Sequence, residues 1–295
     1  MPKISIVIPA LNEEKFLPLL LDSISKQTFK DYEVILADAG STDETIAVAK
    51  KFGITIVKGG MPGVGRNRGS EVAKGDFIFF FDSDVIIPET FLEKAISEME
   101  DRFLDLATCE FNPLSELNID KVLFQFSNLI VKMNQNINPR AAGFCIFITR
   151  RLFNRINGFD ESVVIAEDHD LVERATKFRP LRFLNTTSLS VSVRRLDKEG
   201  RLSLLQKYIK VEMHLLTKGS VRDEIVEYEF GNFTDDDKQK QRKILTDIED
   251  GILKLDKQIT SISTEISTKA TELEDKLKSV LQNLNSDFRK FFRKD

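Results

Sequence analysis

Acidic residues follow short apolar segments at three places in the first part of the chain. Asp82-Ser83-Asp84 comes directly after the apolar run Phe77–Phe81, and Asp38 comes just before Gly40. Asn12-Glu13-Glu14 follows a third apolar segment. Carboxylates two positions apart on a strand share one face, and a hard divalent cation binds one or two carboxylates together with water and phosphate oxygens. The pattern therefore predicts a site for a cation and a phosphorylated ligand, although each motif alone could be an ordinary turn.

Three further segments carry residue types that suit such a site. Gly59–Gly69 is rich in glycine, so its backbone could approach a diphosphate, with Arg66 as a charged partner. Glu167-Asp168-His169-Asp170 starts a predicted helix, where carboxylates either complement the helix dipole or include a general base. Asp168 is the best candidate for that base. Arg194-Arg195 could bind phosphate or could face solvent.

The spacing of apolar residues predicts the elements that carry these groups. Over residues 1–110, short apolar segments alternate with helical patterns, which is typical of a mostly parallel sheet covered by helices on both faces. Ligands bind such sheets beyond the carboxyl ends of the strands, where the acidic motifs fall. The expected strands are Ile4–Ile8 (ending at Pro9), Val34–Leu36, Ile54–Val57, Phe77–Phe81, Leu106–Phe111, Phe144–Ile148 and Ser188–Val193.

Helices are expected over residues 16–24, 46–52, 66–73 and 202–216. A longer amphipathic helix is expected over Leu117–Met133, with Val122, Phe126, Leu129 and Met133 at helical spacing. We expect this apolar stripe to face the core, and a ligand-binding groove is the alternative.

Composition narrows the class of protein. The chain has 295 residues, of which 43 are basic and 47 acidic, and the resulting mild acidity excludes a general nucleic-acid binder. Neither a signal peptide nor a run of about 18 apolar residues is present in the sequence. We therefore expect a cytoplasmic protein that could associate with the inner face of the membrane. Cys109 and Cys145 are expected to be small buried residues.

The pattern changes after Asp235-Asp236-Asp237, and the remaining residues contain no proline. Apolar residues then recur at alternating steps of three and four positions, which predicts a coiled coil over residues 236–292. We expect this segment to make the protein a homo-oligomer, and folding back onto the rest of the chain is the alternative. The residues of this seam are Leu245, Ile248, Ile252, Leu255, Ile259, Ile262 and Ile266.

Taken in order, the motifs over residues 3–200 resemble those of the family 2 inverting glycosyltransferases. The resemblance implies an α/β GT-A fold (nucleotide-diphospho-sugar transferase), a Rossmann-like, mostly parallel sheet sandwiched by helices, to which the C-terminal coiled coil is added. It divides the chain into a nucleotide-sugar-binding half (1–105), an acceptor and catalytic-base half (106–200), a helical linker (201–235) and the coiled coil (236–292). The motifs begin with Ile6–Glu14, Asp38–Asp43, Gly63–Gly69 and Asp82–Asp84, and continue with Gly158–Glu161 and Glu167-Asp168.

The resemblance also implies roles for single residues. Asp168 corresponds to the catalytic base, with Glu167 in support, and Asp84 and Asp82 correspond to the metal motif for Mn²⁺ or Mg²⁺. The residues expected to bind the nucleotide sugar are Pro9, Ala10, Leu11, Glu13, Asp38, Gly65, Arg66, Asp82, Ser83, Arg194 and Arg195.

The implied activity is metal-dependent transfer of a sugar, of the hexosyltransferase type, from a nucleotide-diphosphate donor to a hydroxyl of a glycan or lipid-linked acceptor, with inversion. Such an enzyme would serve glycan, glycolipid or polysaccharide synthesis and could associate peripherally with a membrane. The alternatives are a nucleotidyltransferase and a non-catalytic, transferase-like scaffold organised by the coiled coil.

Overall fold

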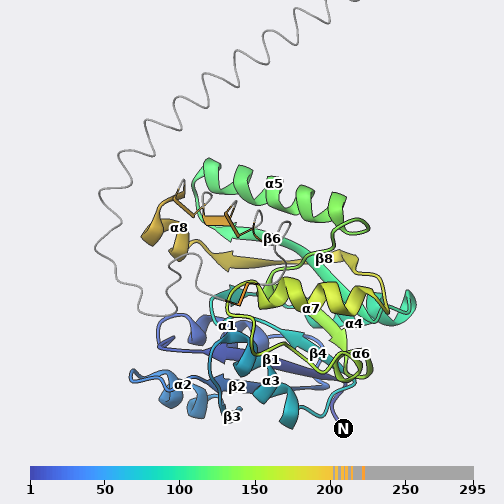
Figure 1. Ribbon diagram of the computed structural model, residues 1–295. Helices are drawn as coiled ribbons and strands as arrows, with labels where there is room; N and C mark the ends of the chain where they lie inside the picture. Colours follow the sequence, from blue (N-terminus) through green and yellow to red (C-terminus); the bar gives the residue numbers. More distant parts are fainter. Residues whose placement is uncertain (202, 205–206, 209, 212–213, 215–220, 223–295) are drawn as a thin grey trace, which may run out of the picture. The chain divides into compact units, whose positions relative to one another are not determined.

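The computed structural model describes residues 1–201, 203–204, 207–208, 210–211, 214 and 221–222 (Figure 1). Within them, one eight-stranded sheet has the order β3-β2-β1-β4-β7-β6-β8-β5, so it contains strands from both predicted halves of the transferase region. The strands are β1 (Ile4–Ala10), β2 (Tyr32–Asp38), β3 (Thr55–Lys58), β4 (Phe77–Phe80), β5 (Val85–Ile86), β6 (Leu106–Leu114), β7 (Ile146–Thr149) and β8 (Arg182–Ser192).

The sheet is mixed rather than mostly parallel. Strands β3, β2, β1 and β4 run parallel as predicted, but β7 is antiparallel to both β4 and β6. Strand β8 is parallel to β6 and antiparallel to β5. The prediction was wrong beyond β4 because an apolar run reports burial on both faces and does not report strand direction.

Helices cover both faces of the sheet. Alternate residues of β1 point to opposite faces, so Ile4, Ile6 and Ile8 join the core with α1 and α4, whereas Val7 joins the core with α6 and α7. The helices are α1 (Leu17–Ser25), α2 (Thr45–Lys51), α3 (Pro62–Val72), α4 (Phe91–Asp101), α5 (Asn118–Asn134), α6 (Arg150–Arg155), α7 (Glu167–Thr176) and α8 (Arg194–Glu199), with a 3₁₀ turn, η1, at Gly143–Cys145.

Strand β1 continues through Pro9, where the sequence predicts that it ends. The carbonyl of Ala10 accepts a hydrogen bond from Ala39 on the β2 side, and the carbonyl of Val7 accepts one from Phe81 on the β4 side. Pro9 has the same orientation as Val7, but lies beyond the last pair of β1 with β4. Its missing N–H therefore leaves no ladder bond unmade, which is the condition under which a strand tolerates proline.

Helix α3 begins at Pro62, earlier than the predicted start at Arg66, and thus contains Gly63 and Gly65 as well as Gly69. A Cβ atom on Gly65 would lie 3.2 Å from Pro9 Cβ, and one on Gly69 would lie 2.4 Å from Val7 Cγ1. These glycines thus let α3 pack directly against β1, at the helix propensity cost that glycine carries.

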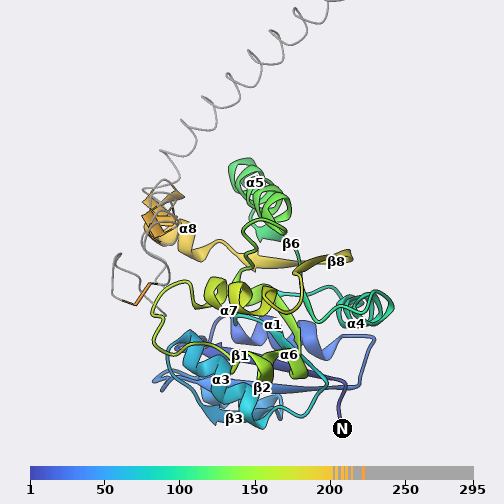
Figure 2. The same ribbon diagram turned by 45° about the vertical axis from the view of Figure 1, so that its right-hand side comes forward.

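Helix α5 exposes the apolar stripe that we expected in the core. The buried side of α5 uses Phe124, whose ring packs on Phe111 at 5.6 Å between centroids, and Asn128, which hydrogen-bonds both backbone groups of Phe111. Both views show α5 at the outside, beyond β6 (Figures 1 and 2). The exposed residues are Val122 (58%), Phe126 (60%), Leu129 (53%) and Met133 (69%).

Three further expectations concern the cysteines, a membrane-spanning helix and the coiled coil. Cys109 and Cys145 are buried free thiols, as predicted. No helix in the described part of the chain has the length and apolar character needed to cross a membrane. The predicted coiled coil over residues 236–292 lies outside the described residues.

The packing of α3 against β1 predicts the effect of a single methyl group. Gly69→Ala should lower the free energy of unfolding by about 1–3 kcal/mol, because the new Cβ overlaps Val7 and outweighs the better helix propensity of alanine. Urea denaturation measures this difference. Glu71→Ala, at an exposed position of α3, is the control and should change stability by less than about 0.5 kcal/mol. Equal stability of both variants would contradict the close contact.

Candidate functional site

The carboxyl ends of β1, β2 and β4 meet at one edge of the sheet and bring their acidic residues together. Asp38 ends β2 opposite Ala10 of β1, and Asp82 follows β4 by two residues. Because these strands are parallel, their ends lie side by side, as expected for a ligand site in an open α/β sheet.

Asp38 presents a buried acceptor at this edge. Its Oδ2 accepts hydrogen bonds from the backbone N–H groups of Gly40 (3.0 Å) and Ser41 (3.1 Å). Its Oδ1 is buried and has no hydrogen-bond partner among the described residues. A buried carboxylate oxygen without a donor is unfavourable, so Asp38 is suited to accept an N–H or O–H from a ligand.

The loops that follow β1 and β2 are joined by reciprocal hydrogen bonds. Asn12 N–H donates to Ser41 Oγ at 2.9 Å, and Thr42 N–H donates back to Asn12 Oδ1 at 2.8 Å. Glu13 N–H donates to Thr45 Oγ1 at 2.7 Å. These bonds position the residues expected to contact a nucleotide before any ligand arrives.

Arg66 joins the two sequence halves of the site. Its side chain is only 3% exposed, with Nη2 2.8 Å from Asp82 Oδ1 and Nη1 2.5 Å from Glu167 Oε1. A Cβ on Gly143 would lie 2.5 Å from Arg66 Nη2, so glycine is needed where this backbone covers the guanidinium. Arg66, which we expected near a diphosphate, thus forms a buried bridge between two carboxylates.

The candidate base is held at the start of α7. Asp168 Oδ2 accepts the N–H of Gly143 at 2.8 Å, and Oδ1 accepts the N–H of His169 at 2.8 Å. Ala166, which precedes this turn, has a left-handed backbone with φ of 62°. Asp168 therefore has a fixed orientation near Arg66 and Glu167.

Pairing of β5 with β8 places Arg194 beside Asp84. Asp84 directly precedes β5 and Arg194 follows β8, so the antiparallel pair Val85–Val191 brings them together. Arg194 Nε lies 2.9 Å from Asp84 Oδ2. Its two terminal nitrogens also form a fork with Glu13, at 2.6 and 2.7 Å from Oε2 and Oε1.

Burial and repulsion by neighbouring carboxylates raise the pKa values of Asp84, Asp168 and Glu167. Burial raises the pKa of Asp84 to about 6, and the charges of Asp82 and Glu13 add to the shift although Arg194 opposes it. Burial likewise raises the pKa of Asp168, with a contribution from Asp82 and opposition from Arg66. The pKa of Glu167 is raised by burial and by Asp168. Shifted carboxyl groups gathered in one place are typical of functional sites.

The acidic residues suit a divalent cation that also binds phosphate. In the described residues, no three His, Cys, Asp or Glu side chains lie close enough to hold a metal ion between them. The protein would thus supply Asp84, with Asp82 near it, and phosphate oxygens and water would complete the coordination, as Mg²⁺ commonly requires. Burial raises the pKa of Asp84, and the nearby charges of Asp82 and Glu13 add to the shift, so a bound cation would stabilise the charged form of Asp84. The donor set therefore fits Mg²⁺ or Mn²⁺.

Most of the residues predicted from the sequence lie in this region. Pro9 packs against Gly65, and Ser83 is buried between the two aspartates. Leu11 is half-buried after β1, and Arg195 is half-buried on α8 next to Arg194.

Sequence reasoning missed three contributors: Gly143, Phe159 beneath Arg66 and Phe16 beneath Arg194. The ring of Phe159 lies 5.5 Å from Arg66 Cζ, and that of Phe16 lies 4.4 Å from Arg194 Cζ. For Phe159 a signal existed, since it belongs to the motif Gly158–Glu161.

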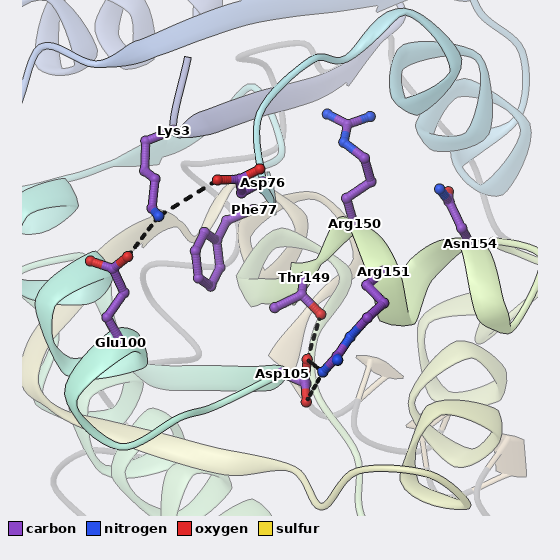
Figure 3. A pocket seen from close by; sticks show the side chains of 9 residues that line it. All are labelled: Lys3, Asp76, Phe77, Glu100, Asp105, Thr149, Arg150, Arg151 and Asn154. Atoms are coloured by element: carbon purple, nitrogen blue, oxygen red, sulfur yellow. Dashed lines mark hydrogen bonds and ion pairs between the residues drawn. The ribbon is translucent and has the colours of Figure 1, made fainter. Parts of the chain in front are cut away.

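A hollow lies at the opposite end of the strands, near the start of β1 and β4 (Figure 3). There Lys3 Nζ lies 2.6 Å from Glu100 Oε1 and 3.6 Å from Asp76 Oδ2. Asp105 likewise pairs with Arg151. The acidic motifs that suggest a ligand site instead follow the carboxyl ends of the strands, so we assign the functional site to that end of the sheet.

Comparison with known proteins identifies the family. A family model described as glycosyl transferase family 2 matches residues 5–155, slightly more than half of the chain. The chain belongs to glycosyl transferase family 2. The match includes Asp38, Arg66, Asp82 and Asp84, and ends before Glu167 and Asp168.

A relative of this family 2 chain is the poly(ribitol-phosphate) β-N-acetylglucosaminyltransferase TarS of Staphylococcus aureus strain Mu50. The two are 26% identical over 202 residues, which cover 65% of this chain and 34% of TarS. The chain thus matches about a third of the length of that relative.

Solved structures share the fold. The crystal structure of S. aureus TarS 1-349 in complex with UDP-GlcNAc has a TM-score of 0.53 at 22% identity, over 64% of this chain and 58% of that one. The mannosyltransferase PcManGT from Pyrobaculum calidifontis, in complex with GDP-Man and Mn²⁺, has a TM-score of 0.55 at 19% identity, over 70% and 64%. The family 2 chain therefore has the GT-A-like α/β fold that its motifs predicted.

The buried bridge of Arg66 predicts a large effect on stability. Arg66→Gln should lower the free energy of unfolding by about 3–5 kcal/mol, because it leaves Glu167 and Asp82 without their shared counter-charge. Denaturant unfolding measures the loss. The matched control is Arg151→Gln, whose side chain is 76% exposed and whose pairing with Asp105 should contribute less than about 1 kcal/mol. Similar losses of unfolding free energy in the two variants would show that the buried bridge stabilises the protein no more than a surface ion pair does.

Proposed function

We propose that this chain is a metal-dependent, inverting glycosyltransferase that moves a sugar from a nucleoside diphosphate to a hydroxyl group of a glycan or lipid-linked acceptor. One observation carries the proposal. Asp168 is held by two backbone N–H groups in the same charged network that contains Asp82 and Asp84, although the sequence separates them by more than eighty residues. A base and a cation site thus come to one place.

In the proposed reaction, Asp168 accepts the proton of the acceptor hydroxyl as its oxygen attacks the anomeric carbon. Attack from the side opposite the departing diphosphate inverts the configuration at that carbon. The raised pKa of Asp168 makes it a stronger base than an ordinary carboxylate, and its fixed orientation aims the accepting oxygen. Arg66 keeps Glu167 and Asp82 in place around it.

The nucleotide would bind at the ends of β1 and β2. Asp38 Oδ1 is available to a donor group of the nucleoside, and the joined loops after the two strands form the wall of the site. A divalent cation held by Asp84, with Asp82 near it, would neutralise charge on the departing diphosphate. The names of the relative and of the solved structures make UDP-GlcNAc and GDP-Man the first donors to test.

The base assignment can be tested by Asp168→Asn. We expect sugar transfer to slow by roughly 10²–10⁴-fold while the dissociation constant of the nucleotide stays unchanged, since Asn keeps the shape but cannot take the proton. Transfer assays and calorimetry measure the two quantities, and NMR of the product reports the anomeric configuration. Wild-type transfer by this variant would rule out Asp168 as the base.

The cation site can be tested by Asp84→Asn. We expect nucleoside diphosphate to bind the wild-type protein more tightly with Mn²⁺ than without it, and the variant to lose this difference. Asp22→Asn, in a surface ion pair with Lys26, is the control that should keep it. Retention of the Mn²⁺ effect by Asp84→Asn would refute the assignment.

The products of the wild-type protein distinguish the alternative functions. Release of pyrophosphate instead of nucleoside diphosphate would indicate a nucleotidyltransferase, and no turnover would indicate a scaffold.

A further inference from the structure

Arg194 occupies a position between two carboxylates that come from distant parts of the sequence. It forks Glu13 with two terminal nitrogens, at 2.6 and 2.7 Å, and reaches Asp84 Oδ2 with Nε at 2.9 Å. The side chain is 15% exposed, and its guanidinium lies over the ring of Phe16. The positively charged side chain of Arg194 therefore links the β1–α1 loop to Asp84, the residue expected to bind the metal.

This contact competes with the cation that the site is expected to bind. A divalent ion on the Asp84 carboxylate would approach the positive Nε–H group that already bonds to Oδ2 of the same carboxylate. Two cations that share one partly buried carboxylate repel each other strongly, because little water screens them. The contact between Arg194 and Asp84 therefore opposes cation binding at Asp84 by charge repulsion.

If Nε leaves Asp84, the terminal nitrogens of Arg194 still bond to Glu13, and the diphosphate of the donor offers Nε a second anionic partner. Arginine has a planar set of N–H donors that matches phosphate oxygens as well as it matches carboxylates. The diphosphate would arrive beside Asp84, because the cation joins the two. Arg194 follows β8 through a short connection and could turn toward the diphosphate without any change in the sheet.

We propose that Arg194 is a positioning residue that holds Asp84 and Glu13 before ligands bind, and that the transfer of its Nε–H from Asp84 to the donor diphosphate couples cation binding to nucleotide binding. This inference rests on the proposed function. Arg194 suppresses binding of the cation alone, and the pair of cation and nucleotide overcomes the suppression. The two ligands therefore strengthen each other's binding beyond their direct contact.

The experiment measures binding of Mn²⁺ alone, by the loss of the electron paramagnetic resonance signal of the free ion. Arg194→Gln should bind Mn²⁺ at least about tenfold more tightly than the wild type, because one charge-assisted hydrogen bond of Asp84 no longer competes. UDP and GDP are then added, and the factor by which each tightens Mn²⁺ binding should be smaller in the variant than in the wild type.

Two further variants make the result specific. Arg195→Gln removes the same charge from the neighbouring position and should tighten Mn²⁺ binding much less, so an equal gain in both variants would overturn the proposal as a general charge effect. Arg194→Lys keeps the charge without the fork and should tighten Mn²⁺ binding to an intermediate degree, which serves if Arg194→Gln fails to fold. Mn²⁺ affinity unchanged by substitution of Arg194 would also overturn the proposal.

The wild-type protein then decides whether the proposed function survives. It survives if the wild type binds Mn²⁺ with nucleotide and transfers sugar. A wild type that binds no Mn²⁺ in any condition contradicts both the proposal and the proposed function.

Discussion

The site depends on one buried guanidinium that two carboxylates share. Arg66 is the group through which Asp82, just after a central strand, and Glu167, at the start of α7, can lie near each other. Without it, the repulsion and desolvation of these groups would separate the two sequence halves at the place where they must meet. Arg194 repeats the arrangement on the other side of the site, between Glu13 and Asp84. The carboxylates thus stay concentrated without a ligand.

Close backbone packing makes this arrangement possible. Helix α3 carries Arg66, its glycines bring it close against β1, and the side chain of Arg66 is buried. Gly143 covers the same guanidinium with its backbone and offers its N–H to Asp168. A single residue without a side chain therefore serves both the counter-charge and the candidate base. The packed helices and strands therefore fix the positions of the charged groups, and the loops after β1 and β2 fix the groups that a ligand would contact.

Much of this organisation could be predicted from the sequence, because its signals are local. Apolar runs ended by Pro, Gly or Asp gave the first four strands, and the order of the motifs gave the family, which the family model confirms. Strand direction beyond β4 and the exposed stripe of α5 depend on contacts between distant segments. The spacing of apolar residues along the chain carries no information about such contacts. The early start of α3 at Pro62 was missed for a similar reason, since a glycine-rich segment is typical of both a phosphate loop and a tightly packed helix. The roles of the single site residues remain predictions.

The hydrogen bonds between the loops after β1 and β2 have a consequence for how donor preference can change. Since Asn12, Glu13 and Glu14 donate to residues 41–45, and that segment donates back, neither loop has a conformation independent of the other. A chimaera that takes one loop from a relative would inherit half of a matched set and lose the shape of both. The two loops, thirty residues apart, therefore form one structural unit, and an exchange of donor preference would have to replace both together.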